Sequence, residues 1–407
     1  MPLPGKSLLL PSLMLPFKEM SMPPHEAPPP RNIAALDGLR GVAILLVLGV
    51  HLVGMDALPR QGLLGAIQAV FWTGWSGVDL FFALSGFLIT GILLDTQRSS
   101  NYFSSFYGRR SLRIFPLYYA ALLLAILLNL VVANTMRLQF PAYAALAHVD
   151  WLRWLAYFVY YQNWWFPPGN PSDLFVRHFW SLAVEEQFYL VWPLCILLLS
   201  RRSLMRLCLL LPIVQLAARI ALVHRLGAHD GYLNANSFFR SDGLFLGALV
   251  ATVVRDRSLL RRGRRAAPFL MAVSALGIAF IDLVQKEIWT RSTWTVTLGF
   301  SLYAIFYASL VFMVFIQNSS GKWLDRRLQA QWLRSFGKYS YGLYVIHMPV
   351  LLLVLPAARH LPGFGKNLAV ALAVYSLVVG TSFGLAWVSY TYFESRFLRL
   401  KSRFQAR

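Results

Sequence analysis

Long apolar runs recur from one end of the chain to the other, and they constrain its fold more than any other feature. The first run covers residues 33–53 and holds only three ionisable side chains, those of Asp37, Arg40 and His51. A transmembrane helix needs about 20 apolar residues to cross the hydrocarbon layer. Hydrophobic residues also make up 57% of the 407-residue chain, which is too large a share for a soluble protein of this length. We therefore predict an all-α polytopic membrane protein.

The runs predict a bundle of about ten transmembrane helices, over residues 33–55, 77–95, 112–132, 179–199, 204–223, 238–254, 266–283, 297–316, 336–355 and 368–392. Residues 155–161 are apolar and aromatic but too short to span, so we expect an interfacial or re-entrant segment there. The proline-rich residues 1–30 are predicted to form a disordered cytoplasmic tail. Residues 31–393 would be the membrane domain and residues 394–407 a basic cytoplasmic tail.

The basic residues predict the orientation of these helices. The formal net charge of +21 would suggest a nucleic-acid partner in a soluble protein. Here the arginines gather in alternate gaps between the apolar runs, as in residues 255–265, and the other gaps hold few of them. Because cytoplasmic loops are enriched in Lys and Arg, this pattern predicts cytoplasmic termini and no nucleic-acid partner. The two cysteines, Cys195 and Cys208, lie in apolar runs and indicate neither a disulfide framework nor a metal site.

The predicted orientation gives each polar residue a depth in the membrane. Arg40 falls in the inner half of the first helix and His51 in the outer half, because the helix rises about 16 Å between them. Three carboxylates also fall on the outer side, and we expect His51 to meet them there: Asp79, Glu185 and Asp242.

A histidine beside a carboxylate is a typical general base, because the partner controls its tautomer and its charge. The alternative is that His51 only hydrogen-bonds to a neighbouring helix. Glu185 and Glu186 point about 100° apart on a helix, so only one of them is expected to face a given site. The alternative for this acidic pair is a buried ion pair with Arg177 or Arg240.

Arg110 and Arg113 are three residues apart and therefore share a helix face. Together with Arg40 on the inner side, their guanidinium groups suit phosphate groups that enter from the cytoplasm. The alternative is that they only supply topological charge and contact lipid headgroups.

Six motifs in order along the chain resemble the integral-membrane acyltransferase family 3, which includes O-antigen, peptidoglycan, exopolysaccharide and macrolide O-acyltransferases. The resemblance runs from about Arg31 to Phe393. The motifs are LDGLRG followed by His51, GVDLFF with LSGFLI, RSLRIFP, FWSLAVEEQFY, RSDGL and SYGLYVIH.

The resemblance implies transfer of an acyl group, usually acetyl, from cytoplasmic acyl-coenzyme A to a hydroxyl of a carbohydrate-like acceptor. It places the family's essential histidine on His51, its arginine on Arg40, its arginine pair on Arg110 and Arg113, and its glutamate on Glu185. His51 would be the general base or carry the acyl group, and Glu185 would orient it, with Asp79 as a second candidate. The candidates for acceptor contact are Arg240, Asp242, Glu186, Tyr341 and His347.

No metal is expected, and the donor acyl-coenzyme A is the only cofactor implied. The chain is expected to be a stand-alone form in the bacterial cytoplasmic membrane, in contact with membrane lipid, with any esterase-like partner domain on a separate protein. The rival function is a proton-coupled transporter or a carrier of a lipid-linked acyl or sugar substrate, since intramembrane His, Asp and Glu also suit a proton relay. Acceptor identity, acyl length and oligomeric state stay open.

Overall fold

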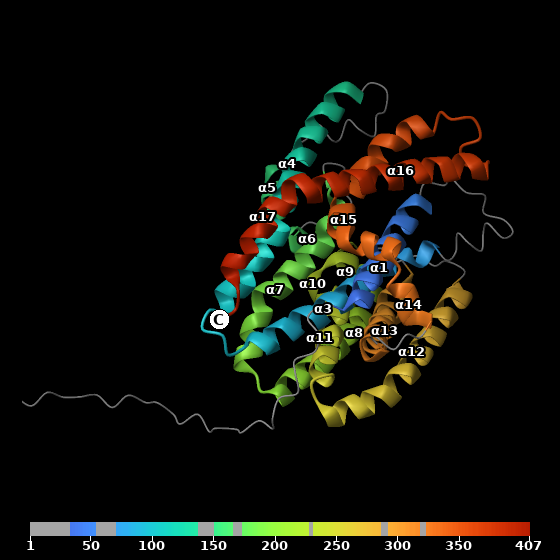
Figure 1. The fold of residues 1–407 in the computed structure, drawn as a ribbon. Coiled ribbons are helices and arrows are strands. Elements are labelled where there is room, and N and C mark those ends of the chain that lie inside the picture. Colours follow the sequence, from blue (N-terminus) through green and yellow to red (C-terminus); the bar gives the residue numbers. More distant parts are fainter. Residues whose placement is uncertain are drawn as a thin grey trace, which may run out of the picture. The chain divides into compact units, whose positions relative to one another are not determined.

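A computed structural model describes residues 33–53, 71–136, 150–165, 173–227, 231–285, 292–317 and 323–407. Residues 33–407 form one unit, shown in Figure 1. The predicted tail over residues 1–30 lies outside the described residues.

Helices make up the described part of the chain, which contains no strand. The long helices are α1 (Ala34–Val53), α3 (Gly77–Thr96), α4 (Tyr102–Met136), α7 (Trp180–Leu198), α8 (Arg201–Leu226), α12 (Arg257–Gln285), α13 (Phe300–Gln317), α15 (Gln331–Ala358) and α16 (Leu368–Val388). The shorter elements are η1 (Thr73–Ser76), α5 (Trp151–Phe158), α6 (Gln162–Trp165), η4 (Arg177–Phe179), α9 (Gly231–Ala235), α10 (Ser237–Arg240), α11 (Asp242–Val253), η5 (Thr295–Gly299), α14 (Trp323–Leu328), η6 (Ser389–Glu394), α17 (Ser395–Arg399) and η7 (Leu400–Phe404).

Nine of the described helices are long and apolar enough to cross a membrane, which confirms the prediction of an all-α polytopic membrane protein. The predicted span over residues 238–254 is wrong as one continuous helix. It is interrupted at Ser241, between α10 and α11, and the 12 residues of α11 rise only about 18 Å. The interruption lets Arg240 and Asp242 each reach a buried partner, and such irregular backbone is tolerated where protein surrounds it.

The helices α1 and α3 lie at the centre of the unit, where α1 packs on α3 and α15, and α3 packs on α11, α13 and α7. Two glycines allow the close approach of α3 and α11. A Cβ on Gly86 of α3 would lie 2.0 Å from the carbonyl oxygen of Leu244, and one on Gly247 of α11 would lie 2.1 Å from that of Ala83. Small residues at both contact points let the two backbones touch, as is common between membrane helices.

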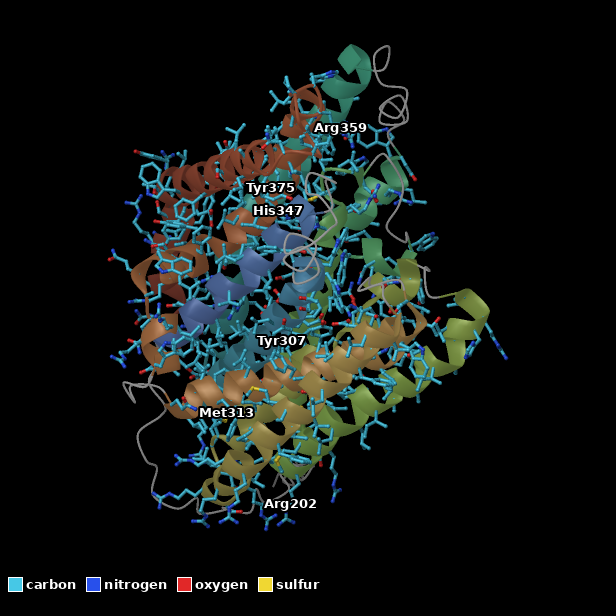
Figure 2. All side chains as sticks on the ribbon, turned by 90° about the vertical axis from the view of Figure 1, so that its right-hand side faces the viewer. Arg202, Tyr307, Met313, His347, Arg359 and Tyr375 are labelled. Atoms are coloured by element: carbon cyan, nitrogen blue, oxygen red, sulfur yellow. The ribbon has the colours of Figure 1, made fainter. Side chains whose placement is uncertain are left out.

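Two labelled arginines mark the ends of the helical unit. Arg202, near the start of α8, and Arg359, just after α15, lie at opposite ends in Figure 2. Arg202 belongs to an arginine-rich gap and Arg359 to an arginine-poor one, so these two gaps lie at opposite ends, as the predicted orientation requires.

Two short helices occupy the segment that the sequence predicted to be interfacial or re-entrant. On α5 the side chains of Trp151, Leu152 and Leu155 are exposed, while Trp154 and Tyr157 are buried. Asp150 caps this helix by accepting a hydrogen bond from the amide of Arg153. A short helix with one apolar face outward suits the headgroup region of a membrane.

Candidate active site

A cavity between α1, α3, α4, α7 and α15 collects most of the residues that the sequence singled out. It holds about 770 Å³ of empty space, part of which is open to the surroundings. The predicted site residues that line it are Arg40, Arg110, Arg113, Glu185, Glu186 and Tyr341.

Two of the three arginines of this cavity differ from other buried and half-buried arginines of the chain. Arg153, Arg219, Arg240 and Arg255 each form an ion pair with an aspartate. Arg40 binds Asp37 one turn away, with 2.7 Å between Nη1 and Oδ1. Neither Arg110 nor Arg113 has an ion pair or hydrogen bond through its guanidinium group within the described residues, although Arg110 lies over the ring of Tyr189. These two cations are therefore available to an anion that enters the cavity.

The acidic pair of α7 lies in the same cavity. Ser85 donates a hydrogen bond of 2.7 Å to Oε1 of Glu185, and the hydroxyl of Tyr189 donates one of 3.2 Å to Oε2. The prediction that only one of the two glutamates would face the site is wrong, since Glu185 and Glu186 both line the cavity. Neighbouring helices border this cavity on several sides, so side chains 100° apart on α7 can both reach it.

His51 lies in a cluster of three histidines. The ring centroids of His51 and His347 are 5.0 Å apart, and those of His178 and His347 are also 5.0 Å apart. Figure 2 shows His347 in the interior of the bundle. Within the described contacts His51 has no hydrogen bond to a carboxylate, so Glu185 and His51 are not brought together in the way we expected.

Backbone carbonyls determine the tautomer of each ring in its neutral form. His51 Nδ1 lies 2.7 Å from the oxygen of Val47, and because a carbonyl only accepts, Nδ1 carries the hydrogen and Nε2 the lone pair. The oxygen of Tyr344 accepts in the same way from His178 Nε2 and His347 Nδ1, each at 2.8 Å. The remaining nitrogens of His178 and His347 are buried and have no partner among the described residues.

Tyr344 connects the cavity with the histidine cluster. Its side chain lines the cavity beside Ser181, and the two hydroxyls lie 2.5 Å apart. Its ring lies 5.2 Å from the ring of His178 and 5.8 Å from that of His347, measured between centroids. The cavity is thus lined both by the arginines and by Tyr344, whose ring contacts His178 and His347 of the histidine cluster.

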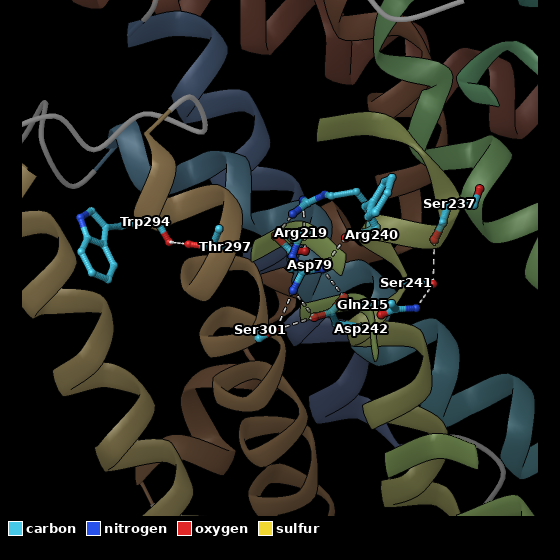
Figure 3. A network of polar contacts seen from close by, with 11 residues as sticks. Asp79, Gln215, Arg219, Ser237, Arg240, Ser241, Asp242, Trp294, Thr297 and Ser301 are labelled. Carbon is cyan, nitrogen blue, oxygen red and sulfur yellow. Dashed lines mark hydrogen bonds and ion pairs between the residues drawn. The ribbon is translucent and has the colours of Figure 1, made fainter. Parts of the chain in front are cut away.

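A separate network of buried ion pairs holds Asp79 and Asp242. Arg219 binds Asp242 through two hydrogen bonds of 2.9 and 2.8 Å, and Ser301 donates to the same carboxylate (Figure 3). Arg240 lies 3.2 Å from Asp79, and its guanidinium group stacks on the ring of Phe300.

The expected meeting of His51 with all three carboxylates therefore does not occur. Asp79 and Asp242 have arginine partners. Glu185 is instead bound to Ser85. Ser85 lies six residues, or about 9 Å, further along α3 than Asp79. The roles of Asp79 in catalysis and of Arg240 and Asp242 at the acceptor stay predictions.

The family model described as an acyltransferase domain, acyltransferase family 3, matches residues 33–390. The chain belongs to this family. It is 26% identical over 339 residues to the O-acetyltransferase OatA of Staphylococcus aureus, a match that covers 80% of this chain and 51% of the relative.

Two further relatives of this acyltransferase family carry similar names. The putative peptidoglycan O-acetyltransferase YrhL of Bacillus subtilis is 28% identical over 356 residues, covering 82% of this chain and 50% of the relative. The peptidoglycan O-acetyltransferase OatA of Listeria monocytogenes is 26% identical over 354 residues, covering 80% and 50%. The chain thus spans about half the length of these relatives. No solved structure matches it significantly. Its long apolar helices and these bacterial relatives place it in the bacterial cytoplasmic membrane.

Several residues of the candidate site and of the ion-pair network beside it were not singled out from the sequence. His178 directly precedes the FWSLAVEEQFY motif, and Ser181 and Tyr189 lie within it, so their position in a motif was the available signal. Arg219 lies in an apolar run without a motif, and only its charge marked it. Within the described residues, no group of three or more His, Cys, Asp and Glu side chains is arranged to hold a metal ion.

Proposed function

We propose that the chain is a membrane O-acyltransferase that moves an acyl group, acetyl in the first instance, from a coenzyme A thioester to a hydroxyl of a carbohydrate acceptor. The observation that carries this proposal is the pair of unpartnered arginines, Arg110 and Arg113, at one part of a cavity that reaches Tyr344 beside the histidine cluster. The names of the relatives support peptidoglycan as the acceptor.

The arginines would bind the phosphates of the donor. Arg110, Arg113 and Arg40 line the cavity together, and only Arg40 uses part of its guanidinium on an internal carboxylate. Guanidinium groups bind phosphate oxygens through paired, charge-assisted hydrogen bonds. The cavity would then admit the thioester arm of the donor toward Tyr344, with the donor entering from the cytoplasm.

His51 would be the general base. Its Nε2 carries the lone pair because Val47 holds Nδ1–H, so no carboxylate is needed to set the tautomer. Nε2 takes the proton of the acceptor hydroxyl while the oxygen attacks the thioester carbonyl carbon. The bond from this carbon to sulfur breaks as the carbon–oxygen ester bond forms, and the proton passes to the departing thiolate. We favour this direct transfer over an acyl group carried on His51, because one arm of the donor can span the cavity.

The experiment measures thiol release from acetyl-coenzyme A by the purified protein in detergent, with and without a peptidoglycan fragment. His51→Ala is expected to lower kcat by about 10²- to 10⁴-fold, the usual contribution of a general base. The matched control is His224→Ala, at an exposed histidine near the end of α8, which should leave kcat unchanged.

A second variant in the same assay tests the donor contact. Arg113→Ala is expected to raise KM for acetyl-coenzyme A by tens-fold, and Arg113→Lys should recover only part of this loss because lysine lacks the planar fork. Arg202→Ala, at an exposed arginine, is the control. Full activity of His51→Ala would contradict the role of His51 as general base. Absence of thiol release from the wild-type protein, together with uptake of an acceptor into proteoliposomes, would contradict the enzyme and favour the transporter.

A further inference from the structure

The C-terminal residues 394–407, predicted to form a basic cytoplasmic tail, pack on the membrane domain. The helical stretch from Leu368 to Phe404 has 37 residues and rises about 55 Å, well over the hydrocarbon thickness of about 30 Å. Its last part, α17 and η7, packs on α4, and we expect it to lie at the membrane surface because the stretch is longer than the hydrocarbon layer is thick. Figure 1 shows the C-terminus beside the beginning of α4.

Hydrogen bonds attach this segment to the start of α4. Ser105, itself buried, donates a bond of 2.9 Å to the carbonyl of Phe404. Asn101 donates to the carbonyl of Gln405 at 2.7 Å and accepts from the amide of Arg407 at 2.9 Å. The amide of Ser100 donates to the carbonyl of Arg407. The segment is thus held in a defined position along α4.

A glycine makes room for the segment. A Cβ on Gly108 would lie 2.3 Å from the ring of Phe404, so any larger residue would force this ring to move. Gly108 lies one helix step from Arg109 and less than two turns from Arg113. The packing of Phe404 therefore sets the distance between η7 and the arginines of α4.

This packing also places Lys401 on the side of η7 that faces α4, because Lys401 is three residues from Phe404 and side chains at this spacing share a face of a 3-10 helix. The side chain is half-buried, and α4 is the helix that carries Arg109, Arg110 and Arg113. Within the described part of the chain its ammonium group forms no ion pair or hydrogen bond. Burying a cation among like charges is unfavourable unless an anion joins them.

We propose that Lys401 is part of the donor site and binds a phosphate of the coenzyme A head group together with Arg110 and Arg113, so that the C-terminal segment completes this site. The inference rests on the proposed function. A phosphate carries up to two negative charges and three acceptor oxygens, which is enough to offset several cations from two elements. A lipid headgroup has the same chemistry, but Arg110 and Arg113 line the internal cavity, which favours a ligand that enters the protein.

The test compares acetyl-coenzyme A with S-acetylpantetheine, which has the same thioester arm and no phosphate, in a nonionic detergent without phospholipid. Lys401→Met is expected to raise KM for acetyl-coenzyme A by about 10-fold or more and to leave kinetics with S-acetylpantetheine unchanged. Lys401→Arg should restore most of the affinity. Arg403→Met removes an exposed charge from the same segment and is the matched control, with KM unchanged.

Gly108→Leu tests whether the packing of Phe404 positions Lys401, since it displaces this ring without changing any charge. It should raise KM for acetyl-coenzyme A and leave KM for S-acetylpantetheine unchanged. An equal rise for both thioesters in Lys401→Met, no rise for either, or a rise that appears only after phosphatidylglycerol is added would overturn the inference.

Binding of free coenzyme A, measured as thermal stabilisation, separates this inference from the proposed function. If coenzyme A stabilises the wild-type protein more than the Lys401→Met variant, but the wild-type protein releases no thiol, the proposed function alone is overturned. If coenzyme A does not stabilise the wild-type protein and the protein shows no turnover, both the inference and the proposed function are overturned.

Discussion

At the scale of single residues, the polar side chains of this membrane protein differ in whether the protein supplies their partners. Asp79 and Asp242 each have an arginine, and His51 has a backbone carbonyl on one nitrogen. Arg110, Arg113 and Lys401 have no such partner among the described residues. Because an unpaired charge is costly away from water, the groups left without partners are those for which a ligand is the best explanation.

The buried pair of Asp79 and Arg240 gives a prediction that separates a structural from a catalytic role. Asp79→Ala should leave Arg240 as an uncompensated buried cation and destabilise the protein by about 3–5 kcal/mol. The double variant Asp79→Leu with Arg240→Met removes both charges and should recover most of the stability, because well-packed apolar pairs can replace buried ion pairs.

Thermal unfolding in detergent and the thiol-release assay measure both properties of the Asp79 and Arg240 variants. If the pair is structural, kcat of the double variant returns with stability. A stable double variant without activity would support a functional role for Asp79 or Arg240, as the sequence predicted, and would contradict a purely structural pair.

At the scale of helices, close packing positions the cavity. Ser85, which holds Glu185, directly precedes Gly86, the residue at which α3 touches α11. The position of Glu185 in the cavity therefore depends on the contact between α3 and α11, which is made on a different face of α3 from the one that carries Ser85.

The close contact at Gly86 gives a prediction about helix packing. Gly86→Ala places a methyl group 2.0 Å from the carbonyl oxygen of Leu244, so α3 and α11 must separate. We expect a loss of about 1–3 kcal/mol of stability, as for other overpacked sites, with a fall in kcat. Gly380→Ala in α16 is the control, since nothing lies within 4 Å of its added Cβ. Equal unfolding temperatures of the two variants would contradict the close contact.

At the scale of the whole chain, the arginine asymmetry predicts cytoplasmic termini. Single cysteines in a background without Cys195 and Cys208 test this orientation. Ser258→Cys, at the exposed start of α12, should react with an impermeant maleimide only after the cells are opened. His360→Cys, exposed after α15, should react in intact cells. The reverse pattern would invert the membrane topology and move the donor arginines to the outer side.

The sequence alone determined the fold class and most of the cavity. The length of the apolar runs required spanning helices, because only apolar helices satisfy their backbone in lipid. The three-residue spacing of Arg110 and Arg113 placed both on one face of α4, and the structure shows both in the cavity. Charge and motif position were enough to mark these residues, since both are local properties of the chain.

Only the tertiary structure decided which polar residues became partners. Arg219 binds Asp242, and His178 lies against His347, across helices whose rotation about their axes no local pattern determines. The same is true of Lys401, which lies on the face of η7 that packs on α4 because Gly108 accepts the ring of Phe404. Depth in the membrane follows from sequence position and topology, but the direction in which a side chain points follows from how the helices pack.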